Sequence, residues 1–401
     1  MSKSSELVRI IIINLVLCLI ILALAETGLR VFYKSKFLTD GNQFVFFEFD
    51  ETLGWKCKPN INGQFKRGEE FDTTISTNSL GMRDKEYSLV KPTGKYRLAV
   101  LGDSFTWGFG VQNEDNYTEV LEKELGKDFE VLNFGVSGFG RGQQLLYMKN
   151  EVLPFKPDAV LIMAYPGNDL SDNMADDYTA TIYPKPSFSV NEDKSLNIEG
   201  IPVKKPSGKF EERMFMRHTG KWMGLYSRSY LFRVFYHAFN TVHKSWEKDP
   251  SEYVNGIYQV KNLKTLKKQA EVEQAIMKEI KRVLDKKGIK LLVTMATTTE
   301  MVRPELQKML HKHAGETEID WQQPARLLTN ASQSLGIPVI NLQPALYKSE
   351  AAGKPVHNKL EFHWSKFGNH LVGKELVPYV RKLKTETLAI EGSETKNETI
   401  Q

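Results

Sequence analysis

Ser104 stands where a serine could act as a nucleophile. The segment "RLAVLGDSFTWGFGV" (residues 97–111) begins as a short apolar run, breaks at Gly102, and continues after the serine with aromatic residues and glycines. Such a serine is either part of an ordinary turn or a nucleophile at the carboxyl end of a parallel strand, where open α/β sheets bind their ligands. The tripeptide Gly-Asp-Ser alone does not decide between these interpretations.

Three further segments carry groups that would complete an acyl-transfer site. "VLNFGVSGFG" contains Gly135 and Gly138, whose missing side chains let a backbone N–H approach a substrate closely. "AYPGNDL" presents the Asn168 carboxamide, and "KLEFHWSKFGNH" contains Glu361 and His363. Each segment by itself is also typical of a turn or a helix cap. Together with the serine they would supply a nucleophile, a base, an orienting carboxylate and oxyanion donors.

The pattern of apolar residues predicts the elements that position these groups. Non-alternating apolar runs, typical of strands buried on both faces, lie at 97–101, 129–134, 158–165, 289–296 and 337–342. Helical patterns lie at 114–126, 141–151, 258–287, 320–335 and 365–384. This alternation predicts an α/β domain with helices on both faces of a parallel sheet. Since the candidate segments follow strands, we expect them at one edge of that sheet.

The order of the four motifs resembles that of the SGNH hydrolases, the GDSL esterase/lipase superfamily. The chain has GDS, then N-x-G-x-x-G, then G-N-D, and finally an acid just before H-W-S-x-x-G. "GDSFTWGFGV" and the apolar N-terminus are similar to the membrane-anchored bacterial branch, and the resemblance covers roughly residues 1–384. It implies a three-layer α/β/α flavodoxin-like fold and chemistry without a metal or other cofactor.

The resemblance also implies a role for each candidate residue. Ser104 would be the nucleophile and His363 the base, while the Ser104 N–H, the Gly138 N–H and the Asn168 side chain would form the oxyanion hole. The chain departs from the family at the acid, because Glu361 stands where family members normally have an aspartate. Glutamate serves as a triad acid in α/β-hydrolases, so Glu361 is the expected acid, with a Ser-His pair oriented by a backbone carbonyl as the alternative.

The N-terminus contains an uncharged apolar segment from Ile10 to Ala25, with Arg9 before it and Glu26 after it. With its amphipathic flanks it is long enough for a short single transmembrane helix. A secretory signal peptide is the alternative, because Ala23-Leu24-Ala25 resembles a cleavage site. Either interpretation predicts that the body of the protein lies outside the cytoplasm.

The same patterns divide the chain into regions. We expect an N-terminal membrane anchor or signal peptide (1–33), a polar, irregular juxtamembrane segment packed on the main domain (34–95), an SGNH hydrolase domain (96–384) and a flexible tail (385–401). An insertion interrupts the domain at about 170–258. Its second half, 212–246, is rich in aromatic residues and arginines, and would line an acyl or glycan site, lie against a bilayer, or pack as a helical excursion on the domain.

Composition excludes several classes of protein. A hydrophobic fraction of 41% is ordinary for a globular chain, and a net charge of +5 over 401 residues gives no support for nucleic-acid binding. The two cysteines, Cys18 and Cys57, form neither a disulfide framework nor a cysteine zinc site.

We therefore expect a single-pass membrane protein whose extracytoplasmic domain, periplasmic or at the cell surface, is a serine esterase. Its substrates would be O-acyl esters on an envelope glycan or a lipid. The alternative is an O-acyltransferase to an envelope glycan that uses the same acyl-enzyme and works with a membrane acyl-donor protein. A catalytically silent envelope-binding protein is a third hypothesis, which the presence of Ser104, Asn168 and His363 disfavours.

Overall fold

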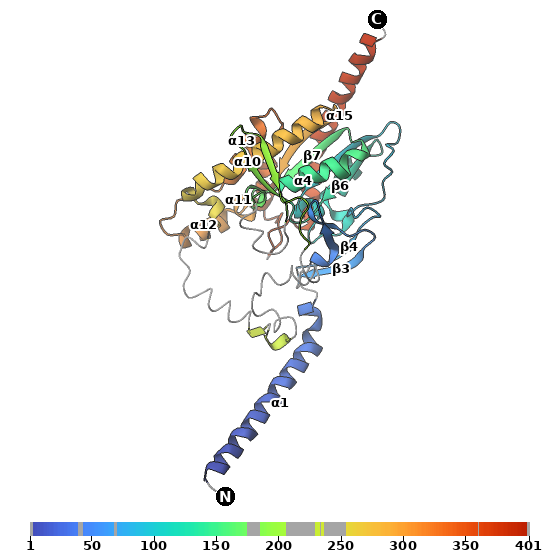
Figure 1. Cartoon of the computed structure of the whole chain (residues 1–401). Coiled ribbons are helices and arrows are strands. Elements are labelled where there is room, and N and C mark those ends of the chain that lie inside the picture. Colours follow the sequence, from blue (N-terminus) through green and yellow to red (C-terminus); the bar gives the residue numbers. More distant parts are fainter. Residues whose placement is uncertain are drawn as a thin grey trace.

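The computed structural model of the chain describes residues 3–38, 43–67, 70–174, 185–205, 229–232, 234–235, 254–359 and 361–398. A long helix, α1 (Lys3–Leu38), leaves the body at one end, and the last turns of helix α15 (Lys366–Glu398) leave it at the opposite end (Figure 1). The body between them is built around one parallel sheet.

The central sheet has five strands, in the order β11-β10-β7-β5-β6, and every neighbouring pair is parallel. The strands are β5 (Tyr96–Gly102), β6 (Phe129–Gly135), β7 (Ala159–Ala164), β10 (Lys290–Met295) and β11 (Val339–Ile340). Counted along the chain this is the order 2-1-3-4-5 of flavodoxin-like sheets. The expected α/β fold with a parallel sheet is confirmed.

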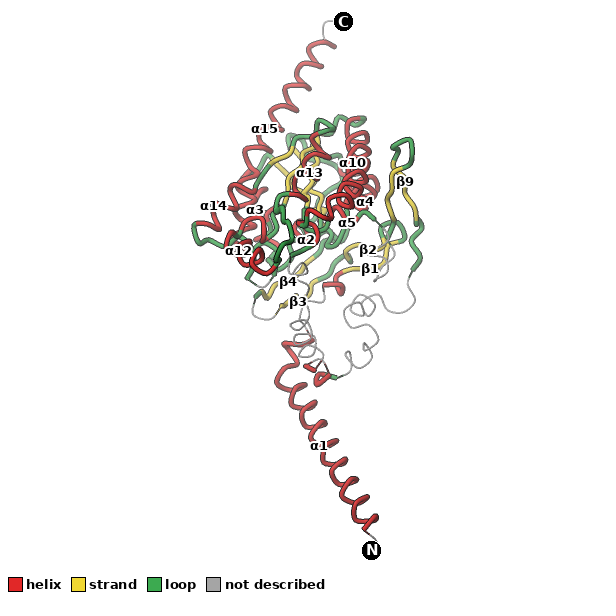
Figure 2. The backbone as a smooth tube through the Cα atoms, turned by 90° about the vertical axis from the view of Figure 1, so that its left-hand side faces the viewer, coloured by secondary structure: helices red, strands yellow, loops and turns green. Residues whose placement is uncertain are grey.

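Helices cover both faces of the sheet, as Figure 2 shows for the yellow strands between two groups of red helices. One face packs on α4 (Arg141–Tyr147) and α10 (Leu263–Asp285). The other face packs on α3 (Tyr117–Leu125), α14 (Gln343–Ala351) and α15. Every residue of β5 and β7 is buried, which explains why these strands read as continuous apolar runs.

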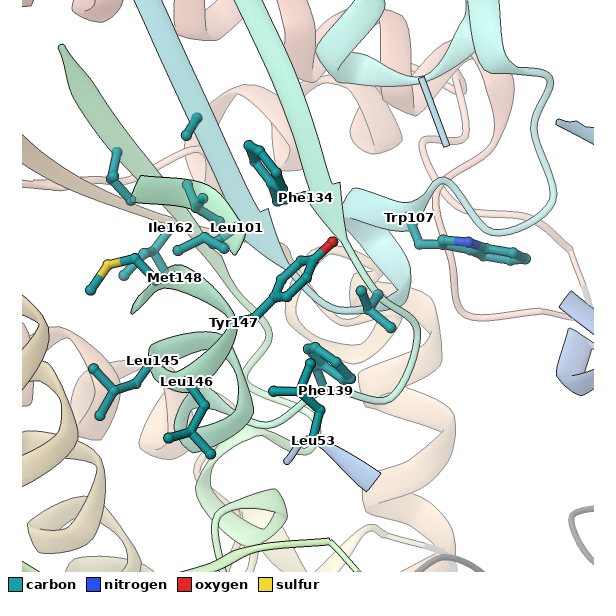
Figure 3. Close-up of a cluster of buried hydrophobic side chains, with 14 of the residues drawn as sticks. Leu53, Leu101, Trp107, Phe134, Phe139, Leu145, Leu146, Tyr147, Met148 and Ile162 are labelled. Atoms are coloured by element: carbon teal, nitrogen blue, oxygen red, sulfur yellow. The ribbon is translucent and has the colours of Figure 1, made fainter. Parts of the chain in front are cut away.

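The core on the α4 face extends from the sheet to the loop after β6 (Figure 3). Leu145 and Leu146 of α4 pack in one cluster with Leu101 of β5 and Ile162 of β7. Leu53, which precedes β5 in the chain, belongs to the same buried cluster as Phe139. This core therefore includes residues that belong to no strand of the central sheet.

Helix α1 contains a stretch, Glu6–Val31, that is long and apolar enough to cross a membrane. Its large apolar side chains are exposed from Leu7 to Leu24. A membrane span and a signal sequence both satisfy this description, so one N-terminal apolar helix is what the structure establishes. The helix continues without a break through Ala25 to Leu38.

The segment expected to be irregular contains two antiparallel hairpins, which is a correction. A 3₁₀ turn η1 (Gln43–Phe46) precedes β1 (Phe47–Asp50) and β2 (Gly54–Cys57), and β3 (Asn62–Arg67) pairs with β4 (Phe71–Ser76). Alternating residues of β4 are buried and exposed, so the strand signal was present in "FDTTIS". Phe65 and Phe71 belong to the same buried cluster as the sheet residues.

The remaining elements are short helices and one further hairpin. They are α2 (Ser104–Trp107), η2 (Asn113–Asp115), a π-helical turn (Met148–Val152), η4 (Leu153–Phe155), α5 (Asp169–Asp172), β8 (Ser187–Val190) with β9 (Leu196–Glu199), η7 (Gly256–Tyr258), η8 (Val260–Asn262), α11 (Thr299–Val302), α12 (Pro304–His313) and α13 (Gln323–Gln333). Nearly all of the aromatic segment 212–246 lies outside the described residues.

The C-terminal tail also differs from expectation. Residues 385–398 continue α15 as helix instead of forming an irregular tail. This part of the chain contains no proline, and four of its fourteen residues are glutamate, which favours helix. The overall division of the chain into regions stays a prediction.

Candidate active site

Ser104 is the first residue of α2, immediately beyond the carboxyl end of β5. Asp103 caps this helix, because its Oδ1 accepts a hydrogen bond of 3.0 Å from the Phe105 N–H. Gly102 is required at the preceding position, since a Cβ there would lie 2.1 Å from Thr106 Oγ1. The tight strand-to-helix turn therefore fixes the backbone that carries the serine.

His363 lies directly opposite the serine. Its Nε2 is 2.7 Å from Ser104 Oγ, although 259 residues separate the two along the chain. Two aromatic rings stack on the imidazole: the ring centroid of Phe109 is 4.2 Å from that of His363, and the centroid of Phe362 is 4.3 Å from it. These stacked rings hold the imidazole in the plane that faces Ser104.

Glu361 binds the other nitrogen of the same imidazole. Its Oε2 accepts a short hydrogen bond from His363 Nδ1, which leaves Nε2 as an acceptor for the Ser104 hydroxyl. The second carboxylate oxygen, Oε1, accepts a hydrogen bond of 2.6 Å from Nη1 of Arg67. The structure thus brings Ser104, His363 and Glu361 into one continuous chain of hydrogen bonds, with the carboxylate and not a backbone carbonyl on Nδ1.

Burial and charge act in opposite directions on these two groups. Burial lowers the pKa of His363 below its ordinary value, and the hydrogen bond and charge of Glu361 only partly oppose this effect. Burial would raise the pKa of Glu361, but His363 and then Arg67 outweigh it and hold this pKa below the ordinary value. At neutral pH the site therefore contains a neutral imidazole beside an ionised carboxylate, the state that a general base requires.

Gly138 lies in the loop that follows β6, the strand paired with β5 on one side. Its φ of +81° is in the left-handed region, where glycine is favoured. The preceding residue is held from two directions: Ser137 Oγ donates to Gln43 Oε1 over 2.6 Å, and Trp55 Nε1 donates to the Ser137 carbonyl over 3.1 Å. Residues that precede β5 in the chain thus fix the loop that carries Gly138.

Asn168 follows β7, the strand paired with β5 on the other side. It occupies the N-cap position of α5, but its side chain makes no capping hydrogen bond. The Oδ1 atom is buried and has no hydrogen-bond partner among the described residues. The Asn168 side chain therefore does not cap α5, and its carboxamide remains available to a ligand.

A buried ion cluster connects the loops after β6 and β7. Arg141, the first residue of α4, pairs through Nη2 with Asp169 over 2.6 Å and through Nε with Glu273 of α10 over 2.9 Å. Asp169 Oδ2 also accepts a hydrogen bond of 2.8 Å from the Tyr165 N–H. Burial raises the pKa of Asp169 well above its ordinary value, and Arg141 opposes that rise. The cluster holds both loops in one arrangement.

Three of the candidate residues follow adjacent strands beside the switch point of the sheet. Strand order reverses between β5 and β7, and in open α/β sheets ligands bind at the carboxyl ends of the strands beside such a reversal. Ser104 follows β5, Asn168 follows β7 and Gly138 follows β6, so all three lie at the ends of adjacent strands. The arrangement can deliver a serine oxygen to an acyl carbonyl and a proton to the histidine.

The sequence interpretation missed Arg67, Gln43 and Trp55. Arg67 is 294 residues away from its partner Glu361, and Gln43 is 94 residues away from Ser137. Contacts over such separations carry no local sequence signal. The one available clue was the alternating pattern of 71–76, which predicts a strand and therefore a folded partner for β3.

Comparison with known proteins agrees with the expected resemblance. Residues 257–400 match the model of a family described as "SGNH hydrolase-like domain, acetyltransferase AlgX". This match includes β10, β11 and the segment with Glu361 and His363, but not Ser104. No curated protein sequence matches the chain.

Similar solved structures include three esterases or acylhydrolases. They are an acetyl xylan esterase, AlAXEase (12% identity, TM-score 0.36, covering 71% of this chain and 99% of that chain), the aryl esterase of M. smegmatis (15%, 0.36, 72% and 99%) and the lipase/acylhydrolase of Enterococcus faecalis (12%, 0.35, 72% and 96%). TM-scores this low carry no argument about substrate or mechanism, so both are derived below from the geometry of the site.

Proposed function

We propose that this chain, whose residues 257–400 match the model of the SGNH hydrolase-like family, is a serine esterase that cleaves O-acyl esters. The observation that carries the proposal is the continuous hydrogen-bonded chain from Ser104 Oγ through His363 to Glu361. A serine hydroxyl is a weak nucleophile unless an adjacent base takes its proton. In this site the base is within 2.7 Å of the hydroxyl and its other nitrogen is oriented by a carboxylate.

In the proposed reaction, Ser104 Oγ attacks the ester carbonyl while its proton passes to His363 Nε2. The resulting oxyanion is stabilised by the N–H groups of Ser104 and Gly138 and by the Asn168 carboxamide. Collapse of this tetrahedral intermediate breaks the bond to the alcohol, which leaves with the proton from the imidazolium. Water then attacks the acyl-serine with His363 again as the base, which releases the carboxylic acid and restores the hydroxyl. Glu361 orients the imidazole throughout and stabilises its charged form.

The second candidate function is transfer of the acyl group to a hydroxyl of an envelope glycan. It uses the same acyl-enzyme, with a sugar hydroxyl instead of water in the second half of the reaction. The observation that favours it is the family match, whose description names an acetyltransferase. Product analysis with and without a glycan acceptor distinguishes the two functions, because a transferase forms the acylated glycan in place of free acid.

We further propose that α1 is a membrane anchor and that the body is extracytoplasmic. The residues around Ala25 are part of a continuous helix that extends to Leu38, which favours an uncleaved segment over a signal peptide. An anchored chain remains in the membrane after a carbonate wash, and protease added to the outside digests its body. Recovery of a soluble mature form that begins at Glu26 would contradict the anchor.

The central experiment measures hydrolysis of chromogenic esters of increasing acyl length by the full-length chain in detergent micelles. We expect measurable hydrolysis, and we expect Ser104→Ala and His363→Ala each to reduce it by at least about 10³-fold, without additivity in the double variant. Equal activity of the Ser104→Ala protein would end the esterase proposal at this site. A serine-reactive phosphonate counts the active sites in each preparation.

A further inference from the structure

Arg67 reaches the candidate triad from a distant part of the chain. It is the last residue of β3, and its Nη1 lies 2.6 Å from Glu361 Oε1. The two partners differ in their surroundings: the Arg67 side chain is 47% exposed, whereas that of Glu361 is 4% exposed. The β3–β4 hairpin therefore forms one border of the active site, with Arg67 at the boundary between the buried carboxylate and solvent.

Glu361 needs a second anchor because of its length. A glutamate has one more rotatable bond than the aspartate usual in the family, so fixing its carboxylate loses more side-chain entropy. Its Oε2 is occupied by His363, through the Nδ1 hydrogen bond and a longer contact of 3.4 Å to the backbone N–H. Among the described residues, the partner of Oε1 is Arg67. A guanidinium on one oxygen and an imidazole on the other define the plane of the carboxylate.

We propose that Arg67 is a positioning residue of the active site, which holds the Glu361 carboxylate in the orientation that aligns His363 with Ser104. The inference rests on the proposed function and extends it to the juxtamembrane hairpin. It makes the glutamate in the acid position and the arginine on β3 one functional unit.

Arg67 also acts on the imidazole through its charge. The charged or titratable groups that influence His363 are Glu361 from its own loop, Arg67 from β3 and His357 from the chain before Glu361. Glu361 raises the pKa of His363, while Arg67 and His357 lower it. Removing the Arg67 charge therefore raises the pKa of the base as long as Glu361 keeps its hydrogen bond to His363 Nδ1. Because the base acts in its neutral form, the acidic limb of the pH–rate profile moves to higher pH.

Two other roles for Arg67 make different predictions. A role in folding is disfavoured by the packing of the hairpin, which is anchored by buried Phe65 and Phe71 while Arg67 is half exposed. A role in direct substrate binding would change KM and leave the position of the acidic limb unchanged. Positioning of Glu361 instead changes kcat and the limb together.

The test compares Arg67→Met and Arg67→Lys with Lys66→Met in the full-length chain. Lys66 is the matched control, because it is the adjacent residue of β3, is 37% exposed and pairs with Asp72 instead of a site residue. We expect Arg67→Met to lower kcat by about 10- to 100-fold, as misplacement of a catalytic group does, and to move the acidic limb to higher pH. Arg67→Lys should retain the limb position of the parent, and Lys66→Met should match the parent in both measurements.

A second measurement does not require turnover. The Nδ1 proton of a carboxylate-bound imidazole gives a downfield proton NMR signal, and its titration reports the pKa of His363. We expect this signal to weaken or shift, and its pKa to rise, in Arg67→Met but not in Lys66→Met. An unchanged signal with unchanged kcat would overturn the proposal, and so would an effect confined to KM. If the parent protein lacks Ser104-dependent ester cleavage while the signal responds as expected, the esterase function fails and the positioning role survives.

Discussion

Two arginines hold the two sides of this active site, and they do so in different surroundings. Arg141 lies beneath the loops that carry Gly138 and Asn168, where its side chain and those of Asp169 and Glu273 are 1–3% exposed. Arg67 pairs with Glu361 on the acid–base side, where its own side chain is 47% exposed. Both pairs connect distant elements through a distance of 2.6 Å.

The difference in burial assigns the two arginines different tasks. Removing one partner of a buried pair leaves an uncompensated charge, so such a pair fixes a structure rigidly. A pair that is open to water contributes little to stability, because solvent screens it and its side chains lose entropy. The side with Gly138 and Asn168 is thus held as part of the fold, whereas the side with Glu361 can be adjusted without unfolding the protein.

The largest expected effect is on stability and lies on the buried side. Arg141→Met leaves Asp169 and Glu273 buried without their cation, and we expect the free energy of unfolding to fall by about 3–5 kcal/mol. Chemical denaturation measures it. The control is Lys149→Met, which removes a cation from a more exposed pair with Glu279 that joins the same part of the fold to α10. It should change stability by less than about 1 kcal/mol. An equal loss of unfolding free energy in Arg141→Met and Lys149→Met would contradict the conclusion that burial of the Arg141 pair holds this side of the site rigidly.

The next effect separates catalysis from stability on the same side. Asn168→Ala should lower kcat by about 10²–10³-fold, or roughly 2.7–4 kcal/mol, as loss of an oxyanion donor does, with KM little changed. Its melting temperature should stay near that of the parent, since the side chain caps no helix. The control is Ser171→Ala, whose hydroxyl donates to the Asn168 carbonyl. A folded Asn168→Ala protein within a few-fold of parental kcat would exclude the oxyanion role.

On the acid–base side, Glu361→Gln should lower kcat by about 10²-fold, near the lower end of what general acid–base catalysis contributes. Glu361 raises the pKa of His363 against the effect of burial, so its loss lets that pKa fall further. The acidic limb of kcat/KM then moves to lower pH, opposite to its movement in Arg67→Met. An unchanged rate would indicate a Ser-His dyad, and a limb that moves upward would contradict the assigned electrostatics.

The smallest expected effect is the stability of the Arg67→Met protein. Because the Arg67 side chain is 47% exposed and Glu361 keeps its hydrogen bond to His363, the substitution should change the free energy of unfolding by less than about 1 kcal/mol. Denaturation under the conditions used for Arg141→Met measures it. A loss comparable with that of Arg141→Met would mean that the hairpin depends on Arg67 for folding.

The fold was predictable from the sequence because its signals are local. Continuous apolar runs mark the strands of a sheet buried on both faces. Strand β5 is one residue longer than the expected range at each end, and β6 is one residue longer at its carboxyl end. The hairpins at 47–76 were missed, since short strands with one buried face alternate over only a few residues. Helix α15 extends to Glu398, beyond the expected end at residue 384, because a polar sequence with a glycine but no proline was interpreted as solvated chain.

The residues of the candidate site also divide into those that local sequence signals predict and those that they do not. The five candidate residues follow strands or precede a helix: Ser104, Gly138, Asn168, Glu361 and His363. The topology of a parallel sheet therefore predicts that their segments lie at one edge, without any knowledge of contacts. Their catalytic roles stay predictions. Arg67 and Arg141 could not be found in this manner, because their partners are defined by tertiary packing and an arginine in isolation carries no functional signal.

The hydrogen bond between Gln43 and Ser137 limits how far the Gly138 loop can lie from helix α1. Five peptide steps from the end of α1 at Leu38 to Gln43 span at most about 18 Å, and the turns of α1 beyond Val31 add about 10 Å. In a chain anchored by α1, the Gly138 loop is therefore confined to a layer about 30 Å deep above the apolar span. With the proposed esterase activity, a chain anchored in this way reaches only the esters within this layer, and a long polymer is cleaved only along the stretch that passes through it.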